Sequence, residues 1–198
     1  KPGEGAQTRA AFSARRFIIQ HRRAWLGDGL KTVTVVVVNW NRRDYLEACL
    51  RSLAAQTFRD FDVIVVDNGS TDDSVQVARQ HGAQVILNPQ NRGFCAANNQ
   101  GIAASASPWI ALLNNDAEAD PQWLAELVHT GERHSKAGMV ASKILVWEDP
   151  SVIDKCGHLM YPDGQNRGRG SGQRDRGQFD TEEEVLWPDG CAALYRHA

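Results

Sequence analysis

WIALLNNDAEAD, residues 109–120, is a short apolar run followed at once by a polar loop that carries three carboxylates. Residues 109–113 predict a buried strand. Pro121 predicts the opening of a helix, with Asp120 as its N-cap. In a parallel sheet ligands gather at the carboxyl ends of the strands, and a carboxylate placed there can hold a hard cation against a phosphate. A nucleotide pocket around this loop would need further polar residues at the other strand ends.

Three further strands are predicted upstream, because their residues are rich in β-branched side chains and show no polar alternation. They are TVTVVVV at 32–38, FDVIVV at 61–66 and QVIL at 84–87. Helices are predicted over 42–55, from Ser70 or Thr71 to about 81, and over 94–105, with Asn41 capping the first and Gly82 ending the second. This alternation predicts an α/β fold, a doubly wound and mainly parallel sheet with helices on both faces.

The strand ends carry asparagine and aspartate instead of a glycine-rich phosphate loop. No G-x-G-x-x-G and no G-x-x-x-x-G-K-[ST] follows any of these strands, which disfavours dinucleotide-binding and P-loop classes. Carboxylates and amides can instead bind the edges of a base and the hydroxyls of a ribose.

Composition bounds the class of protein. The chain has 198 residues, 42% of them apolar and 23% charged, with a net charge of -2, so one ordinary globular domain is expected and nucleic acid is not expected as a partner. The four cysteines are widely spaced and the histidines form no ligand pair, so neither a zinc site nor a disulfide framework is predicted. No membrane-length apolar run or signal-peptide pattern occurs, which predicts a cytoplasmic protein, with peripheral contact to the inner face of the plasma membrane left open.

Residues 1–31 read as a separate N-terminal region, a linker followed by a basic helix over 11–30. Arginines surround a short apolar face there, which allows a membrane-surface helix. A helix packed on the flank of the domain is favoured, because Gly27 and Gly29 end the apolar face early.

The pattern weakens after a predicted helix at 121–134. A strand region is predicted at 138–146 and irregular or antiparallel structure at 147–162. The glycine- and arginine-rich stretch at 164–178 predicts a flexible loop, with a phosphate clamp that orders on its ligand as the alternative. Strands at 184–187 and 191–195 are predicted to flank a turn at 188–190.

Five motifs in order resemble the family 2 glycosyltransferases of the GT-A fold. They are VTVVVVNWNRRDYLEACLRSLAAQT, VIVVDNGSTDDS, NRGFCAANNQGI, ALLNNDAEADPQWL and GCAALYR, and together they extend the resemblance over residues 32–198. NWN, VDNGSTD and LLNNDA are most similar to the bacterial rhamnosyltransferase-like members that build surface polysaccharides.

The resemblance implies a nucleotide pocket. Asp67 would accept a hydrogen bond from a base N–H, supported by Asn68 and Ser70, while Arg92 and Gly93 would lie over the base or diphosphate. The residues implied to line the pocket are Asn39, Trp40, Asn41, Asp67, Asn68, Ser70, Arg92, Gly93, Asn98, Asn114 and Asn115.

The metal-binding D-x-D of the family maps onto Asn114, Asn115 and Asp116, where the first carboxylate is replaced by an amide. Asp116 is then the metal ligand expected from the triplet. One carboxylate, two diphosphate oxygens and water can still hold Mg²⁺ or Mn²⁺, so the metal is expected to bind together with the nucleotide. Glu118 and Asp120 are expected to be a solvated turn residue and a helix cap.

The implied reaction inverts the anomeric carbon of a nucleoside-diphosphate sugar, with dTDP-rhamnose favoured and UDP- or GDP-sugars open, and transfers the sugar to a saccharide or lipid-linked acceptor. The family's catalytic base lies downstream of the GCAALYR strand, so it is expected beyond Ala198, and the domain is expected to be incomplete at its C-terminus and poor at transfer. Asp189 is a weaker candidate for the base, and a role in the turn is the alternative.

Two other functions remain open. A nucleotidyltransferase shares the architecture but uses a glycine-rich, lysine-bearing signature that NWNRRD lacks. A nucleotide-sugar-binding module without transferase activity is the second alternative.

Overall fold

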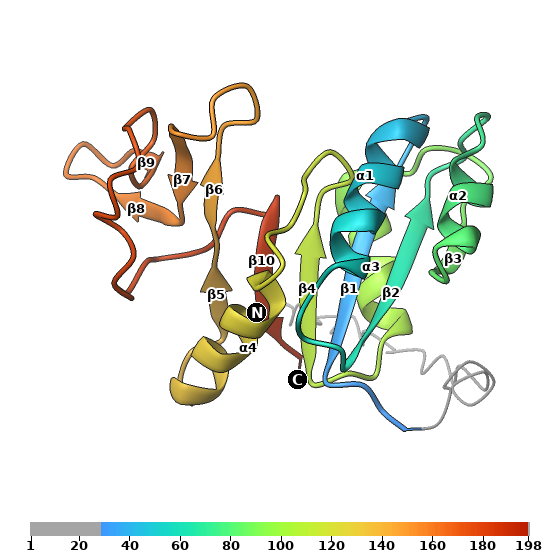
Figure 1. The fold of residues 1–198 in the computed structure, drawn as a ribbon, viewed down its shortest axis with the longest axis horizontal. Helices are drawn as coiled ribbons and strands as arrows, with labels where there is room; N and C mark the ends of the chain where they lie inside the picture. The colour runs from blue at the N-terminus through green and yellow to red at the C-terminus, as the bar shows by residue number, and fades with distance from the viewer. Residues whose placement is uncertain (1–28, 198) are drawn as a thin grey trace, which may run out of the picture. The chain divides into compact units, whose positions relative to one another are not determined.

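A computed structural model describes residues 29–197 (Figure 1). The basic helix predicted over 11–30 lies outside the described residues, apart from Gly29 and Leu30. None of the helices in the described part of the chain is long and apolar enough to cross a membrane.

The centre of the fold is a six-stranded sheet in the order β3-β2-β1-β4-β10-β5. β1 pairs in parallel with β2 and β4, and β2 with β3, whereas β10 runs antiparallel to both β4 and β5. The strand bounds are Gln84–Leu87 for β3, Phe61–Asp67 for β2, Val33–Asn39 for β1, Trp109–Leu113 for β4, Ala192–Arg196 for β10 and Met139–Ala141 for β5. The predicted mainly parallel, doubly wound sheet is confirmed.

Helices cover both faces of the sheet (Figure 1). Val33, Val35 and Val37 of β1 belong to one buried cluster, which also contains side chains of α1, α2 and α4. Val36, between them in sequence, belongs to the opposite cluster with Ala97 of α3. Successive side chains of a strand point to opposite faces, so the unbroken valine run of β1 fills two cores at once. The helices are α1 (Arg43–Ala54), α2 (Ser74–Gln80), α3 (Phe94–Ala104) and α4 (Trp123–Arg133).

The predicted caps of α1 and α2 are wrong. Asn41 has φ +51°, and its Oδ1 accepts a hydrogen bond from the Thr71 backbone N–H at 2.7 Å instead of capping α1. Asp72 serves both helices, because its two oxygens accept from the backbone N–H groups of Arg43 and Ser74, each at 3.1 Å. A cap supplied by a segment 29 residues away leaves no local signal.

α4 begins at Trp123 and not at Pro121. Asp120 still caps the preceding turn, since its Oδ1 accepts from the Gln122 N–H at 2.8 Å. The buried Gln56 completes this helix start: its Oε1 accepts from the Leu124 N–H at 2.9 Å, and its Nε2 donates to the Asp120 carbonyl at 2.7 Å. The end of α1 and the start of α4 are therefore joined by one side chain.

A smaller β region follows β5, in which two antiparallel pairs stand beside the main sheet (Figure 1). β6 (Lys143–Leu145) pairs with β7 (Ile153–Cys156), and β8 (His158–Met160) pairs with β9 (Asn166–Gly168). This agrees with the antiparallel structure predicted for 147–162.

The flexible loop predicted over 164–178 is wrong. This stretch contains β9 and a series of hydrogen-bonded turns, and the Ile153 N–H donates to the Gln173 carbonyl at 2.8 Å. Its glycines permit tight turns that satisfy the backbone without an apolar core of their own.

The strand predicted at 184–187 is also absent from the described fold. Trp187 makes a single bridge to His158, and β10 pairs with β4 and β5 instead of turning back on residues 184–187. Both edges of β10 are thereby occupied, which leaves no backbone groups for the predicted hairpin.

Candidate active site

The candidate site lies at the carboxyl ends of the parallel strands, along the upper edge of the sheet in Figure 1. From β1 the chain continues to β2 and β3 on one side of β1, and then crosses through α3 to β4 on the other side of β1. The direction in which strands are added to the sheet therefore reverses between β1 and β4. In open α/β sheets this reversal leaves a crevice in which ligands bind. The Asn115 Nδ2 donates to Asn39 Oδ1 at 2.7 Å, which joins the polar loop after β4 to the end of β1 across this point.

Asp67 anchors the neighbouring strand end. It is 2% exposed, and its Oδ2 accepts from the Ser70 N–H at 2.9 Å. Its Oδ1 has only a long contact of 3.4 Å from Asn39 Nδ2. The Ser70 hydroxyl accepts from the Asn41 N–H at 2.9 Å. The predicted residues of β1 and β2 therefore form one bonded cluster, in which an Asp67 oxygen keeps capacity for a further donor.

A network of side-chain amides behind this cluster was missed by the sequence analysis. Asn88 Nδ2 donates to Asn68 Oδ1 at 2.9 Å and to Gln100 Oε1 at 2.8 Å, and Gln100 Nε2 donates back to Asn88 Oδ1 at 2.8 Å. Asn68 and Asn88 are almost fully buried. The available signals were the strand-end position of Asn88 and the place of Gln100 in the motif NRGFCAANNQGI, and neither showed that the two side chains pair.

This amide network fixes the loop between β3 and α3. Asn68 Nδ2 contacts the Gly93 carbonyl at 3.4 Å, and the Arg92 N–H contacts Asn68 Oδ1 at the same distance. Gly69 has φ +80°, and a Cβ there would lie 2.9 Å from the Gln90 Cα, so the loop approaches as closely as only glycine permits.

The predicted pocket residues divide into buried supports and exposed groups. Asn98 is 6% exposed and donates to the Phe94 carbonyl of its own helix at 3.1 Å, and Asn68 is bound within the amide network. Trp40, in contrast, is 52% exposed. The exposed members are Trp40, Asn41, Arg92 and Gly93, while Ser70, Asn114 and Asn115 are half-buried.

Asp116 lies exposed in the loop after β4. The Asn114 N–H donates to the Cys191 carbonyl at 2.8 Å, and the Ala117 N–H donates to the Asn114 carbonyl at 3.2 Å, so the loop turns tightly around Asp116. Within residues 29–197, no three His, Cys, Asp or Glu side chains gather into a group that could hold a metal ion. A single exposed carboxylate fits a metal whose other ligands are phosphate oxygens and water.

Two thiols pack under this loop. Cys49 Sγ lies 3.5 Å from the Asn114 carbonyl. Burial, and secondarily the charge of Asp116, raises the pKa of Cys49 to about 12. Burial, then the charges of Asp189 and Asp116, raises the pKa of Cys191 to about 11. Both cysteines are therefore neutral packing residues at neutral pH, as expected for reduced, partly buried thiols.

Asp189 lies in the turn before β10. Its Oδ1 accepts from the Cys191 N–H at 2.8 Å, which is the turn role predicted for it. Burial opposes ionisation of Asp189, but the Cys191 N–H, His158 and Lys155 together lower its pKa below the ordinary value. A carboxylate stabilised in this way is a weaker base, so the structure favours the turn role over the base role.

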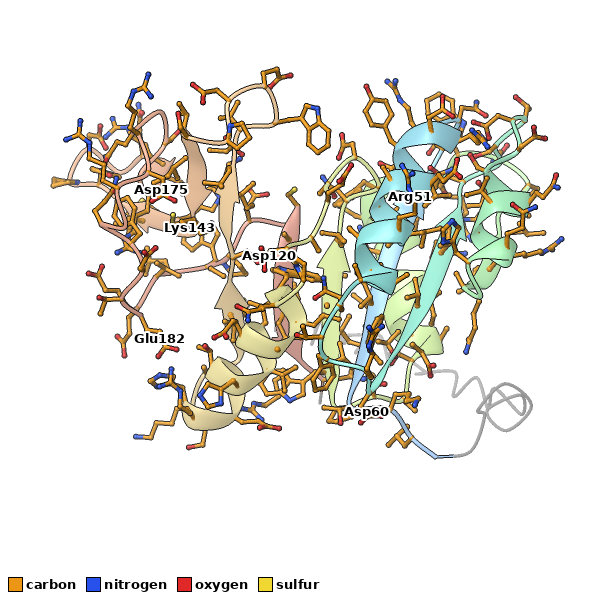
Figure 2. All side chains as sticks on the ribbon, in the orientation of Figure 1. Arg51, Asp60, Asp120, Lys143, Asp175 and Glu182 are labelled. Atoms are coloured by element: carbon orange, nitrogen blue, oxygen red, sulfur yellow. The ribbon has the colours of Figure 1, made fainter. Side chains whose placement is uncertain are left out.

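A hollow of about 870 Å³ lies elsewhere, between α4, β5 and residues 179–188. None of the predicted pocket residues lines it. Charged side chains in and beside it pair with one another: Glu182 binds Arg133 and His134, and Lys143 binds Asp175 and Asp180. Figure 2 labels Glu182, Lys143 and Asp175. The polar cluster at the strand ends is therefore the better candidate for chemistry.

The fold and the polar strand ends define an α/β protein with a candidate ligand site where the strand order of its sheet reverses. The family model "Glycosyl transferase family 2" matches residues 34–197, so the chain belongs to glycosyltransferase family 2. It is 32% identical over 108 residues to the glycosyltransferase AglE of Haloferax volcanii, covering 51% of this chain and 36% of that protein. It is 36% identical over 116 residues to the uncharacterized glycosyltransferase Mb0553 of Mycobacterium bovis, covering 54% of this chain and 51% of that protein.

Solved structures share the fold. The S. aureus TarS 1–349 structure superposes with a TM-score of 0.59 at 18% identity, covering 84% of this chain and 47% of that one. The mannosyltransferase PcManGT of Pyrobaculum calidifontis, solved with GDP-Man and Mn²⁺, gives a TM-score of 0.55 at 21% identity, covering 62% and 38%. The fold is thus that of GT-A glycosyltransferases. The chain spans about half or less of the length of the curated relatives named here.

Proposed function

We propose that this chain binds the donor in an inverting glycosyltransferase that moves a sugar from a nucleoside-diphosphate sugar to a saccharide or lipid-linked acceptor. The Asn115–Asn39 hydrogen bond carries the proposal, because it holds the loop of Asp116 against the strand ends where a nucleotide would lie. PcManGT was solved with GDP-Man and Mn²⁺ and TarS with UDP-GlcNAc, which supports a nucleotide-sugar donor for a chain of this fold.

In this proposal each strand end has a separate task. Asp67 Oδ1, which has only one long contact, accepts the base N–H, and the exposed Trp40, directly after β1, offers an apolar face to the nucleotide. Arg92 and Gly93 face the base or diphosphate from a loop that the buried amides hold in place. Asn39, Asn68 and Asn98 act as supports that preorganise these groups.

Asp116 would hold Mg²⁺ or Mn²⁺ against the diphosphate. When bound, the metal stabilises the negative charge that develops on the leaving diphosphate. One carboxylate alone gives weak affinity for a free metal, so metal and nucleotide bind together.

The donor favoured is dTDP-rhamnose, for the synthesis of a surface polysaccharide. Asp67 accepts from an imide N–H, a group that thymine and uracil share. Guanine N1–H can donate in the same way, so UDP- and GDP-sugars are the alternatives. The resemblance of NWN, VDNGSTD and LLNNDA to rhamnosyltransferase-like sequences supports thymine over uracil.

The test is titration calorimetry of the chain with dTDP, UDP and GDP, each with and without Mn²⁺. We expect Mn²⁺-dependent binding of a pyrimidine nucleotide, weakened at least about tenfold in Asp116→Ala because the metal ligand is lost. Glu118→Ala, which removes an exposed carboxylate two residues away, is the matched control and should bind as the wild type does. Metal-independent binding, or equal affinities of the two variants, would refute the role of Asp116.

A further inference from the structure

The turn before β10, which contains Asp189, contacts two other parts of the molecule, the loop of Asp116 and the smaller β region. Asp189 receives three donors: the Cys191 N–H at 2.8 Å on Oδ1, and His158 Nε2 at 3.1 Å and Lys155 Nζ at 3.3 Å on Oδ2. The exposed fractions of these side chains are 22% for Asp189, 16% for His158 and 26% for Lys155. Partial burial makes such charged hydrogen bonds stronger than those of an exposed pair.

One side of this contact leads to the loop of Asp116. The Cys191 N–H binds Asp189, and the Cys191 carbonyl accepts from the Asn114 N–H at 2.8 Å. Asn114 is the first residue of the Asn114–Asp116 triplet. Asp189 and this triplet are therefore linked by two consecutive hydrogen bonds through the backbone of Cys191.

The other side leads to the smaller β region. Lys155 belongs to β7 and His158 to β8. His158 is itself held, since its Nδ1 lies 3.0 Å from Asn166 Oδ1 on β9 and its ring stacks on Trp187 at a centroid distance of 6.2 Å. Asp189 thus contacts a fixed partner, which gives the turn a rigid support.

We propose that Asp189 is a positioning residue for sugar transfer: one carboxylate oxygen sets the turn that aligns the Asn114–Asp116 loop, and the other ties that turn to β7 and β8. The proposal rests on the function proposed above for Asp116. These three donors give the carboxylate a structural role beside the Asn114–Asp116 loop, which explains its position without a role as base.

The proposal is tested first without any ligand, by amide hydrogen exchange of the whole chain. We expect Asp189→Ala to speed exchange of the Asn114 N–H about tenfold relative to amides of β1, because its acceptor at Cys191 is no longer held. Asp189→Asn keeps an oxygen that can accept from the Cys191 N–H but places an amide NH2 where His158 and Lys155 donate, so its exchange rate should lie between those of the wild type and Asp189→Ala.

The second arm measures Mn²⁺-dependent binding of dTDP and UDP to the same variants. We expect about tenfold weaker binding for Asp189→Ala and a smaller loss for Asp189→Asn, which keeps the hydrogen bond to the Cys191 N–H but not the tie to Lys155 and His158. Asp175→Ala is the matched control, because Asp175 also accepts from a backbone N–H, that of Gly177 at 3.1 Å, and also binds a lysine, Lys143 at 2.7 Å (Figure 2). It should leave both the Asn114 exchange and the affinity unchanged.

The outcomes separate the two proposals. Unchanged Asn114 exchange in Asp189→Ala, or equal losses in Asp189→Ala and Asp189→Asn, overturns the positioning role. Faster exchange of the Asn114 N–H in Asp189→Ala, with unchanged nucleotide affinity, would show that Asp189 holds the loop without mattering for nucleotide binding. That result overturns its role as a positioning residue of the site. If the wild type binds no nucleotide, the proposed function fails, and the exchange arm still decides what Asp189 does.

Discussion

Gly101 marks the closest approach between α3 and the sheet. A Cβ at this position would lie 2.4 Å from Cγ1 of Val36, a stiff side chain that is fully buried in β1. The helix can therefore pack this closely on the strand only because residue 101 is a glycine. This contact sets the distance between the sheet and α3, the helix that carries Gln100 of the amide network.

Gly101→Ala is expected to lower the free energy of unfolding by about 1–2 kcal/mol. The helix gains up to about 1 kcal/mol from alanine, but overpacking against Val36 costs about 1–3 kcal/mol. Urea denaturation followed by circular dichroism measures the difference. Gly138→Ala is the control, since a Cβ there meets nothing within 4 Å, and a larger loss in this control than in Gly101→Ala would contradict the argument.

The sequence predicted which residue types lie at the strand ends better than it predicted which of them support the backbone. Asp67 and Asp116 were recognisable because each follows an apolar strand directly. Whether a strand-end amide touches a ligand or supports the backbone depends on its neighbours in space, and Asn68 is occupied by Asn88, which lies 20 residues further along the chain. Asn88 and Gln100 were missed for the same reason.

At the scale of elements, residues 179–187 are attached to α4 by a single glutamate. Glu182 accepts from Thr130 Oγ1 at 2.8 Å, lies 3.0 Å from His134 Nε2 and binds Arg133. The hydrogen bonds with His134 and Thr130, and then the charge of Arg133, lower the pKa of Glu182 to about 2 from an ordinary value of 4.5. The acidic segment is therefore bonded to α4, although its side chains are exposed.

The contribution of Glu182 to the free energy of unfolding should depend on pH. Because the folded pKa of Glu182 is the lower one, its contribution to stability is present above pH 4.5 and is lost as the pH falls toward about 2. We expect the difference in unfolding free energy between wild type and Glu182→Gln to be constant above pH 4.5 and to vanish near pH 2. Denaturation at a series of pH values measures it, with Glu184→Gln as the control for removing a charge from the same segment. A difference that grows on acidification would contradict this assignment.

At the scale of the whole molecule, the sheet is completed by a strand that comes late in the chain. β10 lies between β4 and β5, and Leu194 in its centre is paired with Ala111 and Val140 and is fully buried. Residues from Lys31 onward form one compact unit, so loss of packing at β10 should weaken the unit as a whole.

Leu194→Ala is accordingly expected to lower the free energy of unfolding by about 2–5 kcal/mol, through lost burial and a cavity. Tryptophan fluorescence and far-ultraviolet circular dichroism should report the same shifted transition. Leu186→Ala, which truncates a leucine that is 51% exposed, should change stability by less than about 0.5 kcal/mol. Equal effects of the two substitutions would show that β10 is not integral to the core.

The sequence by itself determined the elements that are encoded locally: the four parallel strands, the helices between them and the polar residues at the strand ends. These follow from apolar runs and turn residues that act over a few positions. The tertiary structure alone decided the Asp72 and Gln56 caps, the insertion of β10 between β4 and β5, the order of residues 164–178 and the contacts of Asp189. Most of these contacts join segments far apart in the chain, whereas the cap of Asp72 on Ser74 is local. The long-range pairings depend on which backbone groups and charges remain unsatisfied once the sheet has formed.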